Sequence, residues 1–333
     1  MTKKDLDIYF NEDYGRLYEK IEGGILKSFK LECNFGKIKN IFIRRKIPIV
    51  INGKMYNDII TPYGYGGPII LDCDENSKEN LINQYEKEFF EFCMDNNIVS
   101  EFIRFHPIEK NALDFKRIYN IEKNRITLGT NLKDFEDPIG SEFCKNCRRK
   151  IKKALKDGVT FEVEKSPENL DEFIEIYYLT MDRNNALEYY YFDKEYFNNI
   201  LKRFRDNIVI VKAIFKDKVI ASEFCFLSNK TIHIHLSGSL TDYLSLSPTY
   251  VLRYAVTLWG KENGYELVFY GGGRTSSLED GLYKFKKNFS KNTFYDFYIG
   301  KKIWNENIYR KLCESKNVSE VEKFFPAYRK NEL

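Results

Sequence analysis

A lysine at the edge of an apolar helical stripe is the side chain in this sequence best placed to do chemistry. The segment 282–289 reads Leu-Tyr-Lys-Phe-Lys-Lys-Asn-Phe, and on a helix Leu282, Phe285 and Phe289 form one apolar stripe. Lys286 lies roughly 70° from the centre of that stripe, whereas its two lysine neighbours point well away from it. We therefore expect the Lys286 ammonium at the boundary of the core, partly desolvated and facing a cleft. The alternative is three solvated lysines on a surface helix.

Three glycines stand just before this helix. Gly271, Gly272 and Gly273, followed by Arg274, come directly after a predicted strand at 266–270. Bare glycines after a strand expose backbone N–H groups that can bind an oxyanion or a phosphate. The run matches neither a P-loop nor a GxGxxG motif, and a plain tight turn is the alternative. We expect this turn and Arg274 to line a substrate site.

Two of the three histidines fall on one predicted strand. Alternation over 231–237 puts the apolar residues on one face, so the other face carries His233, His235 and Ser237. No convincing third ligand accompanies the histidines, so we predict no metal site. A hydrogen-bonding wall of a substrate cleft is one interpretation, and a half-exposed sheet face is the other.

A carboxylate interrupts the otherwise apolar strand 219–227. Glu223 is costly there unless it is paired or lies at a strand edge. A raised pKa and a role as general base are one interpretation. Placement at the edge of the sheet is the alternative.

A strongly basic helix is predicted from about 143 to 157, ending at Gly158. No acid interrupts its basic residues before Asp157, which favours contact with the phosphates of RNA or a nucleotide sugar. The four cations assigned to this contact are Arg148, Arg149, Lys152 and Lys153. Cys144-x-x-Cys147 lies in the same helix, but no second pair accompanies it and Cys147 is on the apolar face, which disfavours redox or zinc chemistry.

Aromatic residues beside glycines mark two further segments. Tyr63 and Tyr65 belong to the loop 63–68, and Tyr190 belongs to the aromatic run 189–192. We expect these three tyrosines to line a substrate groove, although plain packing explains them equally well.

The elements that must position these residues form two related halves. Helix, polar turn and strand in 92–107 repeat the order and spacing of 258–273. We therefore predict an N-terminal domain at 1–142 and a C-terminal domain at 143–333 that carries the site, with a C-terminal tail packing back on the first domain. Ser277 is the expected cap of the helix that carries Lys286.

The composition supports a folded, intracellular protein of two domains. The 333 residues include 43% hydrophobic and 16% aromatic residues, which excludes a disordered chain. The net charge of +4 is too small for a dedicated nucleic-acid binder. No apolar run is long enough to span a membrane, the first residues contain no signal-peptide core, and seven scattered cysteines fit a reducing compartment. We expect a cytoplasmic protein.

Six segments in a fixed order resemble one known family. They are the loop 63–68, the basic segment 148–158, the aromatic run 189–192, the strand end 236–239, the stretch from Gly264 to the glycine turn, and the helix 282–289. Together they resemble the Fem-type peptidyltransferases, tandem GNAT-fold acyltransferases, over about residues 30–300. The resemblance implies an α/β (α+β) fold of two tandem GNAT-like domains, each a mixed, mostly antiparallel sheet flanked by helices.

The resemblance also implies an activity. Fem-type enzymes transfer an amino acid from aminoacyl-tRNA to the peptide stem of a peptidoglycan precursor. In that family the lysine matching Lys286 is functional, and the position matching His235 lines the acceptor site, where tyrosine is usual. The long helical-hairpin arm of some members is missing here, as it is in the arm-less members.

Three hypotheses follow. The first is aminoacyl-tRNA-dependent transfer to an amine of a peptidoglycan precursor or related cell-envelope substrate, with no tightly bound cofactor. The second keeps the fold but uses acyl-CoA as co-substrate to acylate an amino sugar or small amine; the loop 240–249 lacks the glycine expected around a CoA pyrophosphate. The third is a non-catalytic protein that binds a nucleotide sugar or RNA on this scaffold.

Overall fold

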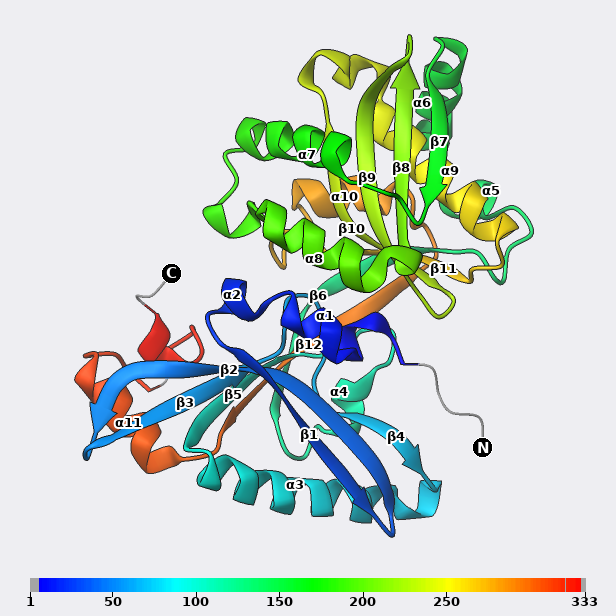
Figure 1. Cartoon of the computed structure of the whole chain (residues 1–333). Helices are drawn as coiled ribbons and strands as arrows, with labels where there is room; N and C mark the ends of the chain where they lie inside the picture. The colour runs from blue at the N-terminus through cyan, green and yellow to red at the C-terminus, as the bar shows by residue number, and fades with distance from the viewer. Residues whose placement is uncertain (1–5, 321, 331–333) are drawn as a thin grey trace. The chain divides into compact units, whose positions relative to one another are not determined.

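The computed structural model describes residues 6–320 and 322–330 (Figure 1). The chain forms two compact units: residues 1–124 with 296–333 make unit 1, and residues 125–295 make unit 2. The chain passes between the units within β6 (Asn120–Asn131) and returns within β12 (Phe294–Ile303). This division differs from the boundary predicted at 142/143, because the residues just before that boundary form the end of β6 and a short helix, both of unit 2.

Unit 1 contains a mixed sheet. Its strands pair in the order β1–β2–β3–β5–β12, and β4 pairs with the start of β2. β3 and β5 run parallel, and the other pairs are antiparallel. The bounds are β1 (Ile25–Cys33), β2 (Gly36–Ile51), β3 (Lys54–Ile60), β4 (Ile69–Cys73) and β5 (Ile98–Arg104).

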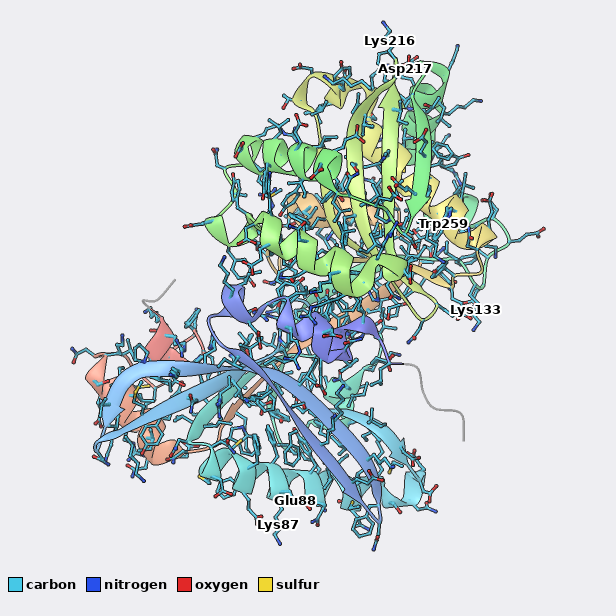
Figure 2. All side chains as sticks on the ribbon, viewed as in Figure 1. Lys87, Glu88, Lys133, Lys216, Asp217 and Trp259 are labelled. Atoms are coloured by element: carbon cyan, nitrogen blue, oxygen red, sulfur yellow. The ribbon has the colours of Figure 1, made fainter. Side chains whose placement is uncertain are left out.

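Helix α3 (Lys78–Asp95) is amphipathic and buries one stripe against this sheet. Leu81, Tyr85 and Phe89 recur every four residues and belong to one hydrophobic cluster with the strands. Lys87 and Glu88 lie on the outer side of the helix, away from the sheet (Figure 2). The other helical segments of unit 1 are η1 (Ile8–Phe10), α1 (Glu12–Arg16), α2 (Glu19–Glu22), η2 (Glu75–Ser77), α4 (Asn111–Asp114), α11 (Glu306–Ser315) and η6 (Ala327–Arg329).

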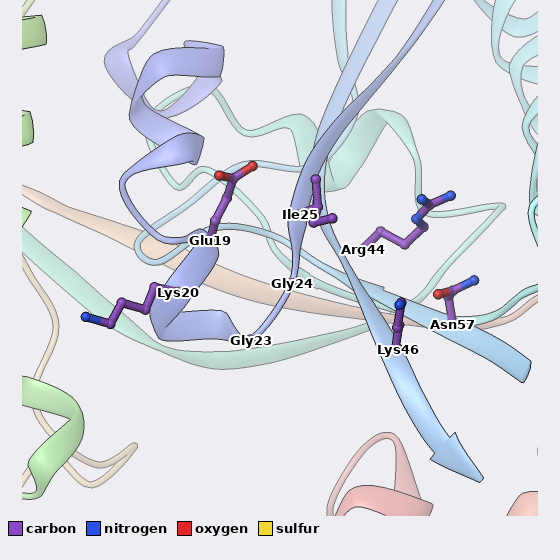
Figure 3. Close-up of a pocket in the computed structure, with 8 residues that line it drawn as sticks. All are labelled: Glu19, Lys20, Gly23, Gly24, Ile25, Arg44, Lys46 and Asn57. Carbon is purple, nitrogen blue, oxygen red and sulfur yellow. The ribbon is translucent and has the colours of Figure 1, made fainter.

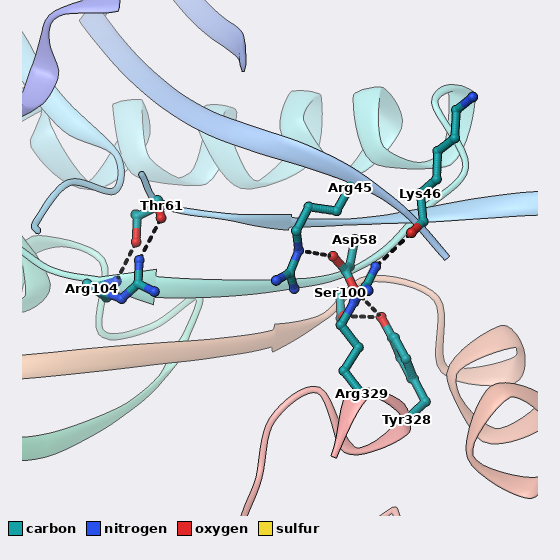
Figure 4. Close-up of polar contacts among 8 residues, drawn as sticks. All are labelled: Arg45, Lys46, Asp58, Thr61, Ser100, Arg104, Tyr328 and Arg329. Atoms are coloured by element: carbon teal, nitrogen blue, oxygen red, sulfur yellow. Dashed lines mark hydrogen bonds and ion pairs between the residues drawn. The ribbon is translucent and has the colours of Figure 1, made fainter. Parts of the chain in front are cut away.

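A buried carboxylate ties the C-terminal turn to the sheet of unit 1. Asp58 of β3 is 1% exposed and pairs with Arg45, 2.7 Å away, and with Arg329 (Figure 4). The hydroxyl of Tyr328 donates to the same carboxylate at 3.3 Å. Two guanidinium groups and a phenol thus satisfy one interior charge, which fixes the position of the C-terminal turn within this unit.

Unit 2 contains the remaining strands, which also pair in mixed directions. Its strands pair in the order β6–β11–β10–β9–β8–β7, and β10 and β11 are parallel while the rest are antiparallel. Lys216 and Asp217 both take positive φ at the tip of the β8–β9 hairpin, which they close in a tight turn (Figure 2). The bounds are β7 (Thr160–Lys165), β8 (Ile208–Phe215), β9 (Lys218–Ser228), β10 (Thr231–Ser239) and β11 (Leu267–Gly271).

Helices cover both faces of the strands of unit 2 (Figure 1). On one face, α6 (Lys145–Lys156) and α9 (Pro248–Glu262) share a cluster with the strands; on the other lie α7 (Asp171–Arg183) and α8 (Lys194–Phe204). Each unit is therefore a mixed sheet flanked by helices, and the predicted fold class is confirmed. The remaining segments are α5 (Pro138–Glu142), η3 (Glu188–Tyr190), η4 (Arg205–Asn207), η5 (Thr241–Leu246) and α10 (Gly281–Lys287). No helix within the described residues is long and apolar enough to cross a membrane.

Candidate active site

A bulge in β10 redirects the side chains that the sequence placed on one face. Between Ile234 and Leu236, β10 advances two residues while β9 advances one, so His235 is an extra residue in the strand. Because a one-residue bulge reverses the face that later side chains take, Ser237 is separated from the histidines. Its hydroxyl donates to Oε2 of Glu223 at 2.8 Å. The prediction of three polar side chains in one row is therefore wrong for Ser237.

Beyond this point β10 and β11 stop pairing with each other. Their parallel ladder covers only residues 231–233 and 267–269, after which β10 continues along β9 alone. At this level Arg253 of α9 pairs with Glu223 of β9 and lies over the ring of Tyr270 of β11, 5.3 Å from its centroid. One guanidinium thus connects the strands on either side of the separated β10.

The Glu223–Arg253 pair lies inside the protein. Glu223 is 1% exposed and Arg253 4% exposed, and β9 lies between β8 and β10, so the expected edge placement of Glu223 is wrong. Burial lowers the pKa of Arg253 to about 10. Its Nε has no hydrogen-bond partner among the residues that the structure describes. The carboxylate pairs with Arg253 and accepts from the hydroxyl of Ser237, and its expected role as general base stays a prediction.

Lys286 lies next to this pair, where helical periodicity placed it. Its side chain is partly buried, and Nζ donates to the carbonyl of Gly272 at 2.7 Å. Burial lowers the pKa of Lys286 from its usual value to about 7; the charges of Arg253 and Arg125 lower it further, and Asp280 opposes them. An ammonium has three N–H groups, and Gly272 is its one hydrogen-bond acceptor within residues 6–320 and 322–330. The other two remain available to an incoming anion.

The glycine turn presents carbonyl oxygens to cations. Gly272 accepts from Lys286, and Gly273 accepts from Arg125 at 2.7 Å. A Cβ on Gly272 would stand 2.7 Å from Cδ of Arg125, and one on Gly273 would stand 2.6 Å from Asp280. Glycine is required here because side chains and backbone approach closely. The expected anion-binding role of these N–H groups stays a prediction.

The cap of α10 differs from the sequence prediction. Asp280, not Ser277, is the N-cap residue, and its carboxylate accepts the N–H of Tyr283 at 2.9 Å. That hydrogen bond holds the pKa of Asp280 below its usual value. The helix therefore begins at Gly281, three residues later than expected, with Arg274 exposed in the preceding loop.

The two histidines occupy apolar surroundings. The ring of His235 packs against Phe226, with centroids 5.0 Å apart, and its Nε2 shares a 2.7 Å hydrogen bond with the hydroxyl of Tyr196 of α8. Burial lowers the pKa of His235 to about 3, and His233 adds to the effect. His233 is 1% exposed beside Phe269. His235 is thus a neutral hydrogen-bonding group, and groups of His, Cys, Asp and Glu able to hold a metal are absent from the described part of the chain.

The basic helix has the expected place on the surface of unit 2. Four exposed cations lie on α6 and are called the α6 cations below: Arg148, Arg149, Lys152 and Lys153. The helix ends as predicted, with Gly158 at φ +96°. Its buried face belongs to the cluster shared with α9. The cations therefore face solvent, and their phosphate-binding role stays a prediction.

The three tyrosines lie in different units. Tyr190 is 40% exposed in unit 2, and its carbonyl accepts from Tyr177. Tyr63 stacks on Tyr18, and Tyr65 packs among Tyr9, His106 and Phe297, all within unit 1. Their expected contact with substrate stays a prediction.

Unit 1 also has an open groove of about 420 Å³. Its lining includes Glu19, Lys20, Arg44 and Asn57, which leave their strands and helix in different directions (Figure 3). Because these polar side chains do not converge, the groove offers no set of groups that holds one reacting atom.

Sequence reasoning missed two cations near Lys286. Arg253 belongs to an apolar helix, and a single arginine in such a sequence is easily taken for an ordinary exposed residue. Arg125 lies in a polar strand, far along the chain from the glycine turn that it contacts. The charge of Arg253 inside the stripe of α9 was the available signal, because an unpaired interior charge is expensive and demands a partner.

Comparisons with known proteins agree with this architecture. Residues 141–287 match the family model described as an acetyltransferase (GNAT) domain. The UDP-N-acetylmuramoylpentapeptide-lysine N(6)-alanyltransferase of Weissella viridescens is 26% identical over 170 residues, covering 50% of this chain and 49% of that protein. The match thus spans about half of that relative.

Two solved structures share the fold over most of their length. The crystal structure of FemX has a TM-score of 0.71 at 14% identity, covering 93% of this chain and 95% of that one. The structure of L-PGS from Bacillus licheniformis has a TM-score of 0.57 at 16% identity, covering 91% and 94%.

Residues 141–287 are thus similar to a GNAT acetyltransferase domain, and the chain as a whole shares the fold of FemX. The alanyltransferase match and the FemX superposition confirm the resemblance to the Fem-type peptidyltransferases.

Proposed function

We propose that this protein transfers an aminoacyl group from aminoacyl-tRNA to an amino group of a peptidoglycan precursor. The observation that carries the proposal is the partly buried Lys286, held on the Gly272 carbonyl with two N–H groups available for an anion. Support for the acceptor comes from the alanyltransferase of Weissella viridescens, whose name specifies the lysine of a UDP-linked muramoylpentapeptide.

The reaction would proceed by addition and elimination at an ester carbonyl. The acceptor nitrogen attacks the carbonyl carbon, the carbonyl oxygen becomes an oxyanion, and collapse expels the ribose oxygen while the nitrogen loses a proton. Lys286 would donate to the oxyanion or to a donor phosphate, and the fixed Gly272 carbonyl would orient it beforehand. An approaching anion favours the charged form of Lys286, so binding itself would protonate this residue. Groups on the substrate would accept the proton.

Other side chains would hold the two substrates. His235 is a neutral group aimed by Tyr196 and would hydrogen-bond the acceptor together with its neighbours. The α6 cations would contact phosphates of the tRNA or of the nucleotide-linked acceptor. Arg253 would act through charge, because it lies beside Lys286 and is itself buried.

A second candidate uses acyl-CoA, because residues 141–287 match an acetyltransferase domain. The segment before α9 is the 3₁₀ helix η5, followed by Ser247 at φ +55° and Pro248 as the first helical residue. This arrangement differs from an open glycine loop, which is the usual way to bring backbone N–H groups to a pyrophosphate.

The experiment is a transfer assay with purified protein. Alanyl-, seryl- and glycyl-tRNA and acetyl-CoA are each offered with UDP-N-acetylmuramoylpentapeptide, and mass spectrometry detects the modified peptide. The proposal predicts a new amide on the stem-peptide amine with at least one charged tRNA. Acylation with acetyl-CoA alone would favour the second candidate, and the absence of any transfer together with binding of tRNA would favour a non-catalytic protein.

A further inference from the structure

Two cysteines that the transfer chemistry does not use lie together at the start of α6. Cys144 is the N-cap residue, and its Sγ accepts the N–H of Cys147 at 3.3 Å. Both thiols pack on the same hydrophobic cluster, Cys147 fully buried and Cys144 partly exposed. The sulfur of Cys144 therefore already contacts the backbone of Cys147. Helical periodicity alone did not reveal this proximity.

The geometry suits a bond between these residues. Side chains three positions apart on a helix have Cβ atoms about 5–6 Å apart, and a disulfide needs about 3.5–4.5 Å. The N-cap backbone of Cys144 is extended (φ −65°, ψ 156°) and lies outside the helix, so a small backbone movement of the first turn closes this gap and side-chain rotation then aligns the two sulfurs. Among cysteines, the more accessible one attacks and the buried one resolves. Cys144 and Cys147 fit these two roles.

The pair is connected to the helix that carries Lys286. The N–H of Cys144 donates to the carbonyl of Asn288 at 2.8 Å, and its thiol donates to Oδ1 of the same residue at 3.3 Å. Asn288 is the C-cap of α10, and its amide donates to the carbonyls of Lys284 and Phe285 at 3.2 Å each. A change at Cys144 therefore acts directly on the end of α10, two residues from Lys286.

We propose that Cys144 and Cys147 are a thiol-oxidation site that forms a reversible disulfide with a hydroperoxide as oxidant. The Cys144 thiolate attacks the terminal peroxide oxygen, the O–O bond breaks, and Cys144 becomes a sulfenic acid. The sulfur of Cys147 then attacks that of Cys144, the S–O bond breaks, and water leaves with the proton of Cys147. With hydrogen peroxide, two thiols and one peroxide give one disulfide and two waters, and a dithiol reverses the reaction.

Oxidation would loosen the end of α10. The disulfide removes the hydrogen bond that the Cys144 S–H donates to Asn288. It also ties up the Cys144 sulfur, which caps α6 by accepting the N–H of Cys147. We therefore expect the amides of 281–288 to exchange with solvent severalfold faster in the oxidised protein. This proposal is independent of the transfer reaction, because neither readout requires turnover.

The test titrates the full chain with hydrogen peroxide, blocks remaining thiols with N-ethylmaleimide, and maps disulfides by mass spectrometry. We expect a Cys144–Cys147 bond at substoichiometric to equimolar peroxide, reversed by dithiothreitol. Cys144→Ser keeps an N-cap oxygen and should fold normally while abolishing the bond. Cys225→Ser, a buried cysteine elsewhere in the same cluster, is the matched control and should leave the bond intact.

Two results would overturn the proposed disulfide. One is peroxide treatment that leaves both thiols free, and the other is oxidation of Cys144 to sulfinic acid without any bond to Cys147. A bond that forms but leaves the hydrogen exchange of 281–288 unchanged would refute the proposed effect on α10.

Discussion

The charge of Lys286 is the most direct point at which to perturb the proposed reaction. Lys286→Met removes the donor while keeping the length and apolar packing of the stem. Loss of one preorganised donor to an oxyanion costs on the order of 10² to 10³ in kcat, or about 2.7–4 kcal/mol. Lys284→Met is the matched control, because that lysine is on the same helix but exposed and paired with Glu279. We expect a loss of that size for Lys286→Met and less than threefold for the control.

The pH dependence identifies which form of Lys286 acts. Its pKa is about 7, so the ammonium dominates below pH 7 and is lost above it. If the ammonium is the working form, its contribution to kcat/KM falls about tenfold per pH unit above 7. Lys286→Arg keeps its charge at all these pH values. Dividing the kcat/KM of the wild type by that of Lys286→Arg therefore removes the effect of titrating the acceptor amine, and this ratio should fall as the pH rises.

The assay is initial-rate transfer from radiolabelled aminoacyl-tRNA at pH 5.5–9, with circular dichroism to verify folding. A ratio that rises with pH would mean that the neutral amine is the working form, as a base. Transfer by Lys286→Met at the wild-type rate would refute the assignment entirely.

Three further outcomes follow from charges in the structure. Glu101 of β5 is buried, which raises its pKa to about 7. The folded protein should therefore lose on the order of 3 kcal/mol of stability as pH rises from about 4.5 to 7. Glu101→Gln should remove this pH dependence of the free energy of unfolding in urea titrations. Arg253→Met should lower the free energy of unfolding by about 3–5 kcal/mol because Glu223 is left charged and unpaired, and the double variant with Glu223→Gln should recover much of it. Replacing the α6 cations by glutamine should weaken the binding of tRNA. The slope of log K against log salt concentration should also become shallower, by about 0.7–0.9 for each phosphate that is no longer neutralised. The same replacement at Lys216 and Lys218 should change neither the affinity nor the slope.

Local signals in the sequence predicted much of this fold. Periodicity put Lys286 at the edge of the core. Gly158 marked the end of α6, as its positive φ confirms. Each of these features depends on residues within one helical turn, so their physical causes are visible in a short segment.

The features that were missed depend on distant residues. The bulge at His235 is set by how β10 pairs with β9, and no alternation pattern records an extra residue. The boundary between the units falls inside β6 and inside β12. The sequence at both places is that of an ordinary strand, so it gives no sign of a boundary. Asp280 displaced Ser277 as the cap because its carboxylate also accepts the N–H of Thr275, an interaction that depends on the folded loop.

Arg253, one member of the buried pair, contributes to the lowered pKa of Lys286, second to burial of the lysine itself. An interior Arg253 costs free energy that an apolar residue would not, and Glu223 offsets that cost only while both remain in place. Among the neighbouring charges, Arg253 lowers the pKa of Lys286 the most. With its pKa near 7, Lys286 would gain charge when an anion binds beside it. In the proposed reaction that charge would develop together with the oxyanion, and it would therefore stabilise the transition state more than the substrate.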